Sequence, residues 1–150
     1  MNYPLFSNEY FMNEALKEAT KAFDKDEVPI GAIIVCENKI IARAHNLTET
    51  LNDVTAHAEI QAITAASNHL GSKYLTSCTL YVTIEPCIMC AGAISWAQIK
   101  KLVYGAKDEK KGYSIIGKNL LPPKIKLIKT ILEEDCEKII KLFFQKKRKK

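Results

Sequence analysis

The sequence predicts a three-layer α/β fold, with a central mixed sheet of five strands between layers of helices. Segments with apolar residues at helical spacing alternate along the chain with short strand-like segments, which is typical of layered α/β domains. Two neighbouring strand-like segments form an apparent hairpin, whereas the strands from residue 78 onward are separated by helical segments and should run parallel. No repeat or flexible linker divides residues 1–150, which predicts a single domain.

The first predicted element is a helix in the stretch SNEYFMNEALKEATKAFDKDE. Ser7 is a suitable N-cap, because its hydroxyl can accept a hydrogen bond from the first helical turn. Apolar residues then recur at helical spacing and share one face. The residues expected to face the core are Phe11, Met12, Ala15, Leu16, Ala19 and Phe23.

A hairpin and a second helix are predicted next. The stretch IGAIIVCENKIIARAHN predicts strands over 30–36 and 39–44, joined by a tight turn at 37–38. Residues 55–69 are rich in Ala and Ile and are predicted to form a helix. This helix should end before Gly71, because glycine is the residue type most common just after a helix.

The second half of the chain predicts three further strands and another helix. CTLYVTI predicts a strand over 78–84. Pro86 suits the first position of a helix that continues to about Gln98, since proline lacks the N–H that this position leaves unpaired. Short strands are predicted over 100–106 (KKLVYGA) and 124–130 (KIKLIKT), with a Gly- and Pro-containing loop between them.

The last predicted element is an amphipathic helix from residue 131, whose stretch 132–150 has a basic end. The net charge of +5 is moderate, but the chain closes in FFQKKRKK without an acidic residue. Such an end can contact phosphates or can simply aid solubility, and charge alone leaves both readings open. The residues expected to face the core are Ile131, Leu132, Cys136, Ile139, Ile140, Phe143 and Phe144.

The composition is that of a soluble globular protein, with 47% hydrophobic and 26% charged residues. No apolar run reaches the roughly 18 residues of a membrane span, and the N-terminus lacks the pattern of a secretion signal. A cytoplasmic protein without a membrane partner is therefore expected. The five cysteines are an odd number, which argues against a disulfide framework and favours metal binding or catalysis.

Two short motifs carry the candidate chemistry: TAHAEI, with His57 and Glu59, and EPCIMC, with Cys87 and Cys90. The two cysteines are three residues apart and share one face at a predicted helix start, where the helix dipole favours thiolates. A single histidine beside an apolar stripe is usually an ordinary residue, and C-x-x-C alone has many meanings. Together, H-x-E and P-C-x-x-C form the signature of zinc deaminases. The other cysteines fit buried structural thiols: Cys36, Cys78 and Cys136.

The motif predicts a catalytic zinc ion held by His57, Cys87 and Cys90. Three protein ligands leave the fourth tetrahedral position open for water, whose pKa zinc brings down to roughly 7. The resulting hydroxide would attack the amino-bearing ring carbon, and Glu59 would move protons to the ring and to the departing ammonia. One geometric question stays open, because residues two apart on an ideal helix point about 200° away from each other.

Several segments closely resemble those of bacterial tRNA-specific adenosine deaminases, a family in the cytidine/deoxycytidylate deaminase superfamily. They are VPIGAIIV, HNLTE, TAHAEI, LYVTIEPCIMCAGAI and LVYGAKDEKKG, and the match covers most of the chain. The resemblance implies a cytidine-deaminase-like fold, a homodimer and one Zn²⁺ per subunit. It also implies conversion of the wobble adenosine in a tRNA anticodon to inosine.

The same resemblance implies residues that contact the substrate. Asn46, in HNLTE, would hydrogen-bond the target base, and Asp108, in GAKDEKKG, would lie beside the target nucleotide. Pro29 and Ile30 would help to form the pocket wall. Without the resemblance, Asn46 reads as a turn residue and Asp108 as a loop or cap residue.

An anticodon loop suits a buried metal site, because its bases are already single-stranded and are easily extruded. This substrate favours RNA contact by the basic end. The nearest alternative is a free-base or nucleoside deaminase, acting on guanine or cytosine with the same zinc site. A silent zinc module that binds RNA or a protein is a further alternative, against which the spare carboxylate of Glu59 argues. The apolar stretch AGAISWAQI fits either a dimer interface or the core.

Overall fold

The computed structural model describes residues 2–149; Met1 and Lys150, the ends of the predicted domain and of its basic segment, lie outside the described residues. No helix within residues 2–149 combines the length and apolar character needed to cross a membrane. The elements, in chain order, are α1 (Asn8–Asp24), β1 (Gly31–Cys36), β2 (Lys39–His45), α2 (Ala58–Leu70), β3 (Cys78–Ile84), α3 (Ile88–Trp96), β4 (Lys101–Ala106), α4 (Tyr113–Ile116), η1 (Lys118–Leu120), β5 (Lys126–Ile128) and α5 (Glu133–Arg148).

The five strands form one mixed sheet in the order β2-β1-β3-β4-β5. β1 pairs antiparallel with β2 and β3, whereas β3–β4 and β4–β5 are parallel, so the predicted hairpin and parallel half are confirmed. The hairpin turn places Glu37 and Asn38 at φ 52° and 61°. Two consecutive left-handed residues form the type of tight turn whose twist matches that of the flanking strands.

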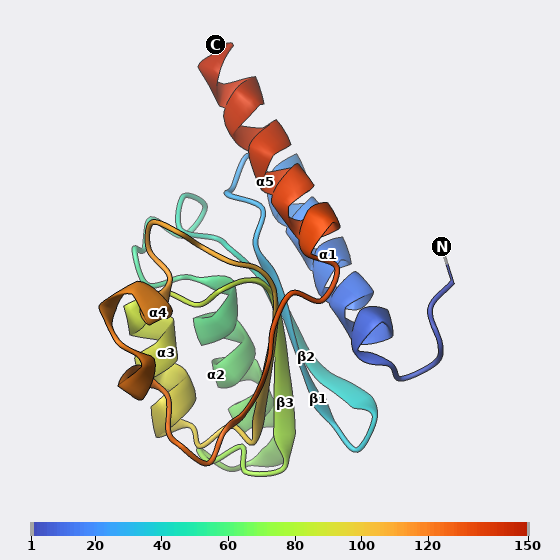
Figure 1. Ribbon diagram of the computed structural model, residues 1–150, viewed down its shortest axis with the longest axis vertical. Coiled ribbons are helices and arrows are strands. Elements are labelled where there is room, and N and C mark those ends of the chain that lie inside the picture. Colours follow the sequence, from blue (N-terminus) through green and yellow to red (C-terminus); the bar gives the residue numbers. More distant parts are fainter. Residues whose placement is uncertain (1, 150) are drawn as a thin grey trace.

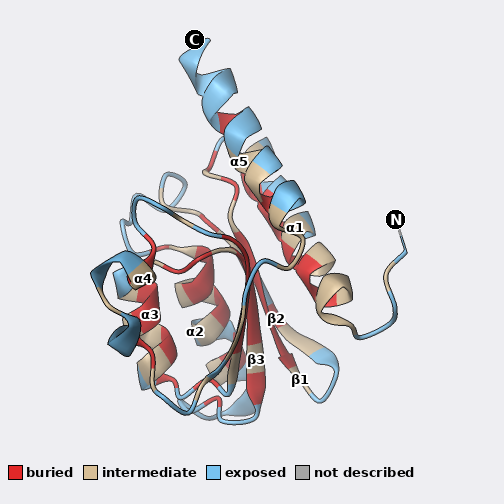
Figure 2. Cartoon of the chain, viewed as in Figure 1, coloured by how far each residue is buried: buried red, intermediate tan, exposed pale blue. Residues whose placement is uncertain are grey.

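Helices cover both faces of the sheet, which confirms the three-layer α/β/α prediction. α1 and α5 lie on one face, and α2 and α3 lie on the other (Figure 1). Adjacent strand residues alternate between two cores: Ile34 packs toward α2 and α3, whereas Ile33 packs toward α1 and α5. Because both faces are covered, β1 is buried almost throughout, as its continuous apolar sequence requires (Figure 2).

The segments that carry the predicted site residues lie together at one edge of the sheet, the edge formed by the ends of the strands rather than by an outer strand. β3 and β4 are parallel and end side by side, with Ile84 opposite Ala106. β1 begins and β2 ends at this same edge, because Gly31 pairs with His45 and β1 runs antiparallel to β3. The chain therefore enters or leaves the sheet here just before β1 and just after β2, β3 and β4.

The helix after β3 starts later than predicted. Pro86 is not its first residue, since Cys87 has an extended backbone, with φ −74° and ψ 176°, and caps a helix that begins at Ile88. The Pro86 carbonyl instead accepts a hydrogen bond from Tyr113 N–H at 2.9 Å. The helix also stops before Gln98, whose φ of 58° is incompatible with a right-handed helix.

The core face of α5 is narrower than predicted. Phe143 is buried and packs edge-on against Phe23 of α1, with ring centroids 6.0 Å apart. Phe144 is 43% exposed, because successive helical residues point about 100° apart and only one of the pair can face α1. Cys36, predicted as a buried thiol, is half-buried, whereas Cys78 and Cys136 are buried.

Candidate active site

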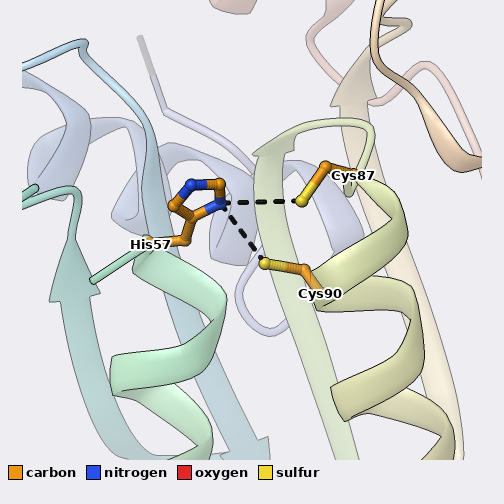
Figure 3. A group of neighbouring side chains, drawn as sticks. All are labelled: His57, Cys87 and Cys90. Atoms are coloured by element: carbon orange, nitrogen blue, oxygen red, sulfur yellow. Dashed lines mark hydrogen bonds between the residues drawn. The ribbon is translucent and has the colours of Figure 1, made fainter. Parts of the chain in front are cut away.

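His57 and Cys87 occupy equivalent positions at the starts of two helices that contact each other. Each residue is the N-cap of its helix, α2 or α3, has an extended backbone, and does not use its side chain as a cap. The two side chains instead face each other, with Nδ1 of His57 3.6 Å from Sγ of Cys87 (Figure 3). Cys90 lies in the first turn of α3, with its Sγ 3.5 Å from the same nitrogen.

The distances in this cluster fit a tetrahedral metal ion. The candidate ligand atoms of His57, Cys87 and Cys90 all lie within 4.8 Å of one another. Zinc–nitrogen bonds of about 2.05 Å and zinc–sulfur bonds of about 2.3 Å place two tetrahedral ligand atoms about 3.5 Å apart. The nitrogen–sulfur distances of 3.6 and 3.5 Å match this value, so the three side chains could hold a metal ion.

The electrostatics of the cluster favour a negatively charged thiolate. A hydrogen bond from Cys90 lowers the pKa of Cys87 to about 4, and the imidazole of His57 adds to this effect. The contact with Cys87 raises the pKa of Cys90, with burial adding to the shift, and the same partner raises the pKa of His57. The thiolate form of Cys87 that these contacts favour is the form that binds a metal cation.

Glu59 places a buried carboxyl group next to this cluster. It lies in the first turn of α2 and is 3% exposed. Burial raises the pKa of Glu59 to about 7, although its contacts with His57 and with the Cys90 thiol oppose the shift. A carboxyl group in this environment is suited to accepting and returning a proton.

The backbone at His57 explains how His57 and Glu59 both reach the cluster. On a continuous helix, residues two apart would point about 200° away from each other. His57 precedes the helix, however, with φ −72° and ψ 154°, so this angle does not apply to it. The histidine points across to α3 while Glu59 approaches from the first helical turn.

Comparison with known proteins shows the family of the chain that carries this cluster. The family profile described as MafB19-like deaminase matches residues 6–148. A guanine deaminase from Bacillus subtilis is 41% identical with a TM-score of 0.64, over 71% of this chain and 66% of that one. A tRNA-specific adenosine deaminase from Bacillus subtilis (strain 168) is 47% identical over 95% of this chain and 92% of its own length. A solved tRNA:A34 deaminase, which edits A to I at the wobble position of transfer RNA, is 44% identical with a TM-score of 0.80, over 87% of this chain and 98% of that one.

The chain belongs to the tRNA-specific adenosine deaminase family.

In this deaminase, Asn46 is joined to the segment that contains Pro29 and Ile30. Its backbone N–H donates to the Ile30 carbonyl at 3.0 Å, and its side-chain amide donates to the Val28 carbonyl at 3.4 Å. Its side-chain oxygen accepts the Thr48 N–H at 3.3 Å. Asn46 and Pro29 are buried and Ile30 is half-buried. Asn46, Pro29 and Ile30 are three of the four residues predicted to contact the substrate. They therefore lie together, in the segments just before β1 and just after β2.

The fourth, Asp108, lies on the loop after β4. Its Oδ1 accepts the N–H groups of Lys110 and Lys111, each at 3.0 Å, and its own N–H donates to the Glu85 carboxylate at 3.2 Å. The hydrogen bonds of Asn46 and Asp108 go to the flanking segments rather than to the cluster around His57. Glu85, which leads directly into the Cys87 turn, is the link between the Asp108 loop and that cluster.

Two buried glutamates that lie two positions before predicted site residues were not themselves predicted: Glu27, before Pro29, and Glu85, before Cys87. Glu27 is fully buried, and its carboxylate accepts the N–H groups of Glu49 at 3.0 Å and Thr50 at 2.6 Å. Burial alone would raise the pKa of Glu27, but hydrogen bonds from Thr50, Glu49 and Thr48 lower it overall. Glu27 precedes the apolar run VPIGAIIV and Glu85 follows the apolar run CTLYVTI. A carboxylate directly beside a buried strand was the available signal, because such a group must find partners inside the fold.

Proposed function

We propose that this deaminase converts the wobble adenosine of a tRNA anticodon to inosine by zinc-dependent hydrolysis. The reaction adds the oxygen of one water molecule to the amino-bearing carbon, breaks the carbon–nitrogen bond and releases ammonia. The observation that carries the proposal is the cluster of His57, Cys87 and Cys90 at tetrahedral spacing, with Glu59 buried beside it. The family relationship supports adenosine in tRNA as the substrate.

His57, through Nδ1, together with the sulfurs of Cys87 and Cys90, would hold one zinc ion per subunit. Two thiolates and an imidazole suit zinc, whereas calcium and magnesium prefer oxygen ligands. When bound, zinc acts as a Lewis acid that lowers the pKa of water at its open position. The helix starts of α2 and α3 both face the cluster, and their dipoles further stabilise the thiolates.

Glu59 would act as the catalytic proton carrier. Its carboxylate takes a proton from the attacking water and delivers protons to the ring nitrogen and to the leaving amino group. Its burial excludes bulk water from this exchange. A structural zinc module would have no use for this carboxyl group, and we infer a catalytic site instead.

The target nucleotide would lie between two segments: the one that contains Pro29, Ile30 and Asn46, and the loop after β4 that contains Asp108. Asn46 would hydrogen-bond the base, Pro29 and Ile30 would form part of the pocket wall, and Asp108 would lie beside the nucleotide. This arrangement requires an extruded nucleotide, which an anticodon loop supplies at low energetic cost.

A groove beside the Asp108 loop supports contact with the rest of the RNA. It runs between the loop, at Lys110, and the C-terminal turns of α5, and the aromatic ring of Phe144 lies in its wall. Cations beside an exposed aromatic ring are suited to phosphates and unstacked bases. The groove is lined by Lys110, Ile140, Lys141, Phe144, Gln145, Lys147 and Arg148.

The enzyme would work as a cytoplasmic homodimer that associates through α3. Ile88, Gly92 and Trp96 recur at intervals of four along this helix and share one face. Ile88 is 48% and Trp96 is 84% exposed, and Gly92 has open space beside it. An apolar helix face that remains exposed in one chain fits an interface with a second copy.

The second candidate function is deamination of free guanine, which the similarity to the Bacillus subtilis guanine deaminase favours. The deciding experiment incubates zinc-loaded protein separately with an anticodon stem-loop RNA and with free guanine, cytosine and adenosine. We expect inosine, read as guanosine on sequencing, at the wobble position of the RNA, together with stoichiometric ammonia. Ammonia from a free base with no change in the RNA would reject the proposed substrate.

A further inference from the structure

Glu85 is a buried carboxylate for which the proposed chemistry has no use. It is 1% exposed, and it lies between the end of β3 and the Pro86–Cys87 turn. A carboxylate at this depth is costly unless its oxygens are hydrogen-bonded. Its partners therefore show what the residue does.

Within the described residues, the side-chain partners of Glu85 come from the loop after β4 and from the first turn of α4. One carboxylate oxygen accepts the Asp108 N–H at 3.2 Å. The other accepts both the N–H of Ser114 at 3.0 Å and its hydroxyl at 2.6 Å. The two oxygens thus form hydrogen bonds with both ends of the segment 108–114.

Backbone contacts strengthen this link at the same place. The Glu85 N–H donates to the Ala106 carbonyl at 2.7 Å, and the Pro86 carbonyl accepts the Tyr113 N–H at 2.9 Å. A Cβ atom at Gly112 would overlap the Glu85 carboxyl group and the Asp108 carbonyl oxygen, so only glycine permits this close approach.

The carboxylate of Asp108 shapes its own loop, whereas the backbone N–H of Asp108 bonds to Glu85. Its Oδ1 accepts the Lys110 and Lys111 N–H groups, which closes a local turn. The attachment to the Cys87 side comes from Glu85 and Pro86.

We propose that Glu85 is a positioning residue that holds residues 108–114, and with them Asp108, in a fixed place relative to the Cys87 turn. The inference rests on the proposed function only for its consequence, that Asp108 meets the target nucleotide. Replacing Glu85 by Gln keeps the size of the side chain but puts an NH₂ group where one of the two oxygens accepts hydrogen bonds. A donor then faces a donor, and the loop loses one of its two anchors.

The first test is amide hydrogen exchange on the zinc-loaded, full-length protein. In Glu85→Gln, protection should fall about tenfold or more at whichever of the Asp108 and Ser114 amides faces the new NH₂ group, while zinc stays at one ion per chain. The Glu49 and Thr50 amides, which bond to Glu27, should keep their protection and so report an intact fold. Ser114→Ala removes only the hydroxyl contact and should produce a smaller change confined to the loop.

Glu109→Gln is the matched control, since it makes the same substitution at an exposed residue next to Asp108. It should leave the Asp108 and Ser114 amides as protected as in the wild type. Unchanged protection of those amides in Glu85→Gln, or loss of protection across the whole protein, would overturn the proposal.

The second test asks whether Glu85 acts through Asp108, using a double-mutant cycle on stem-loop RNA. Glu85→Gln should lower kcat/KM about tenfold in the wild-type background, mainly through KM, but less than about twofold in Asp108→Ala. An equal loss in both backgrounds would reject the link to Asp108. If the wild type does not act on RNA at all, the proposed function fails, whereas the exchange experiment still decides whether Glu85 positions the loop.

Discussion

Nδ1 of His57 lies 3.6 Å from Sγ of Cys87, although 30 positions separate the two residues in the chain. The contact joins the start of α2 to the start of α3, because both residues cap their helices with extended backbones and aim their side chains at each other. A metal ion at this point would therefore connect two helices on the same face of the sheet. Its binding free energy would add to the stability of the fold.

Removal of zinc should destabilise the protein. A ligand at a hundred times its dissociation constant stabilises the folded state by about 2.7 kcal/mol, so a strong chelator should lower the melting temperature by several degrees. Cys87→Ser should abolish stoichiometric zinc, as measured by elemental analysis. Cys36→Ser, at the opposite end of the sheet, is the control and should retain one ion per chain. Full zinc content in Cys87→Ser would disprove its role as a ligand.

Loss of the Glu59 carboxylate should separate metal binding from turnover. Glu59→Ala should retain zinc but lower kcat on stem-loop RNA by about 10²–10⁴-fold, the range for a general acid–base group. Glu59→Gln keeps the size of the side chain and should be similarly inactive. Single-turnover rates and zinc content measured on the same samples make the comparison. Wild-type rates in either variant, or loss of the metal, would contradict the proton-carrier role.

Glu27 should stabilise the protein in a pH-dependent way. Its folded pKa is below the ordinary value of 4.5, so its contribution is complete above about pH 4.5 and is lost as the pH falls through the folded pKa. Glu27→Gln should cost about 1.5–3 kcal/mol of unfolding free energy at neutral pH, because the Glu49 and Thr50 N–H groups lose a charged acceptor. This difference from the wild type should shrink in acid.

Urea unfolding of metal-free protein at neutral and acidic pH measures that difference without interference from ligand protonation. Glu109→Gln is the control, because Glu109 is exposed and should give no comparable loss. A cost for Glu27→Gln that does not change with pH would show that packing, rather than charge, is responsible.

Arg148 and Lys149, at the C-terminal end of α5, should contribute to RNA affinity. Lys147 pairs with Asp26 at 2.6 Å, and Lys146 lies over the ring of Phe23, so deleting the whole tail would also disturb packing. Arg148→Gln with Lys149→Gln removes charge with less structural effect. The double variant should weaken RNA binding several-fold at low salt. It should also reduce the slope of log affinity against log salt concentration by the equivalent of about two phosphate contacts.

Binding titrations at several salt concentrations make this measurement. Lys39→Gln with Lys73→Gln removes the same charge at the opposite end of the sheet and serves as the control. Equal salt slopes for the two double variants would leave the basic end with a role in solubility alone.

Trp96 should be central to the proposed homodimer. Trp96→Lys places a charge on the exposed face of α3 and should shift the protein toward a single 16.9 kDa chain at low micromolar concentration. Analytical ultracentrifugation detects the change. Leu142→Lys, at a residue of α5 that is 47% exposed, should leave the dimer intact. A wild-type protein that sediments only as a monomer would reject the homodimer itself.

Most of the fold was predictable because local patterns and tertiary packing agree. The 78–84 strand has the predicted bounds, the hairpin turn lies at residues 37–38, and Gly71 ends its helix in a left-handed conformation. Predictions failed where a local preference competed with a distant contact. Pro86 favours the first turn of a helix, but its carbonyl accepts a hydrogen bond from Tyr113, and the helix begins after Cys87.

The sequence by itself determined the layered α/β class, the family and the residue types of the candidate metal cluster, because periodicity and short-range motifs encode them. Only the tertiary structure decided how those residues meet. The extended backbone at His57, the exposure of Phe144 and the partners of Glu27 and Glu85 depend on contacts with segments remote in the chain. A carboxylate beside an apolar strand segment indicates from the sequence that the group needs hydrogen-bond partners. The fold alone determines which N–H groups come within its reach.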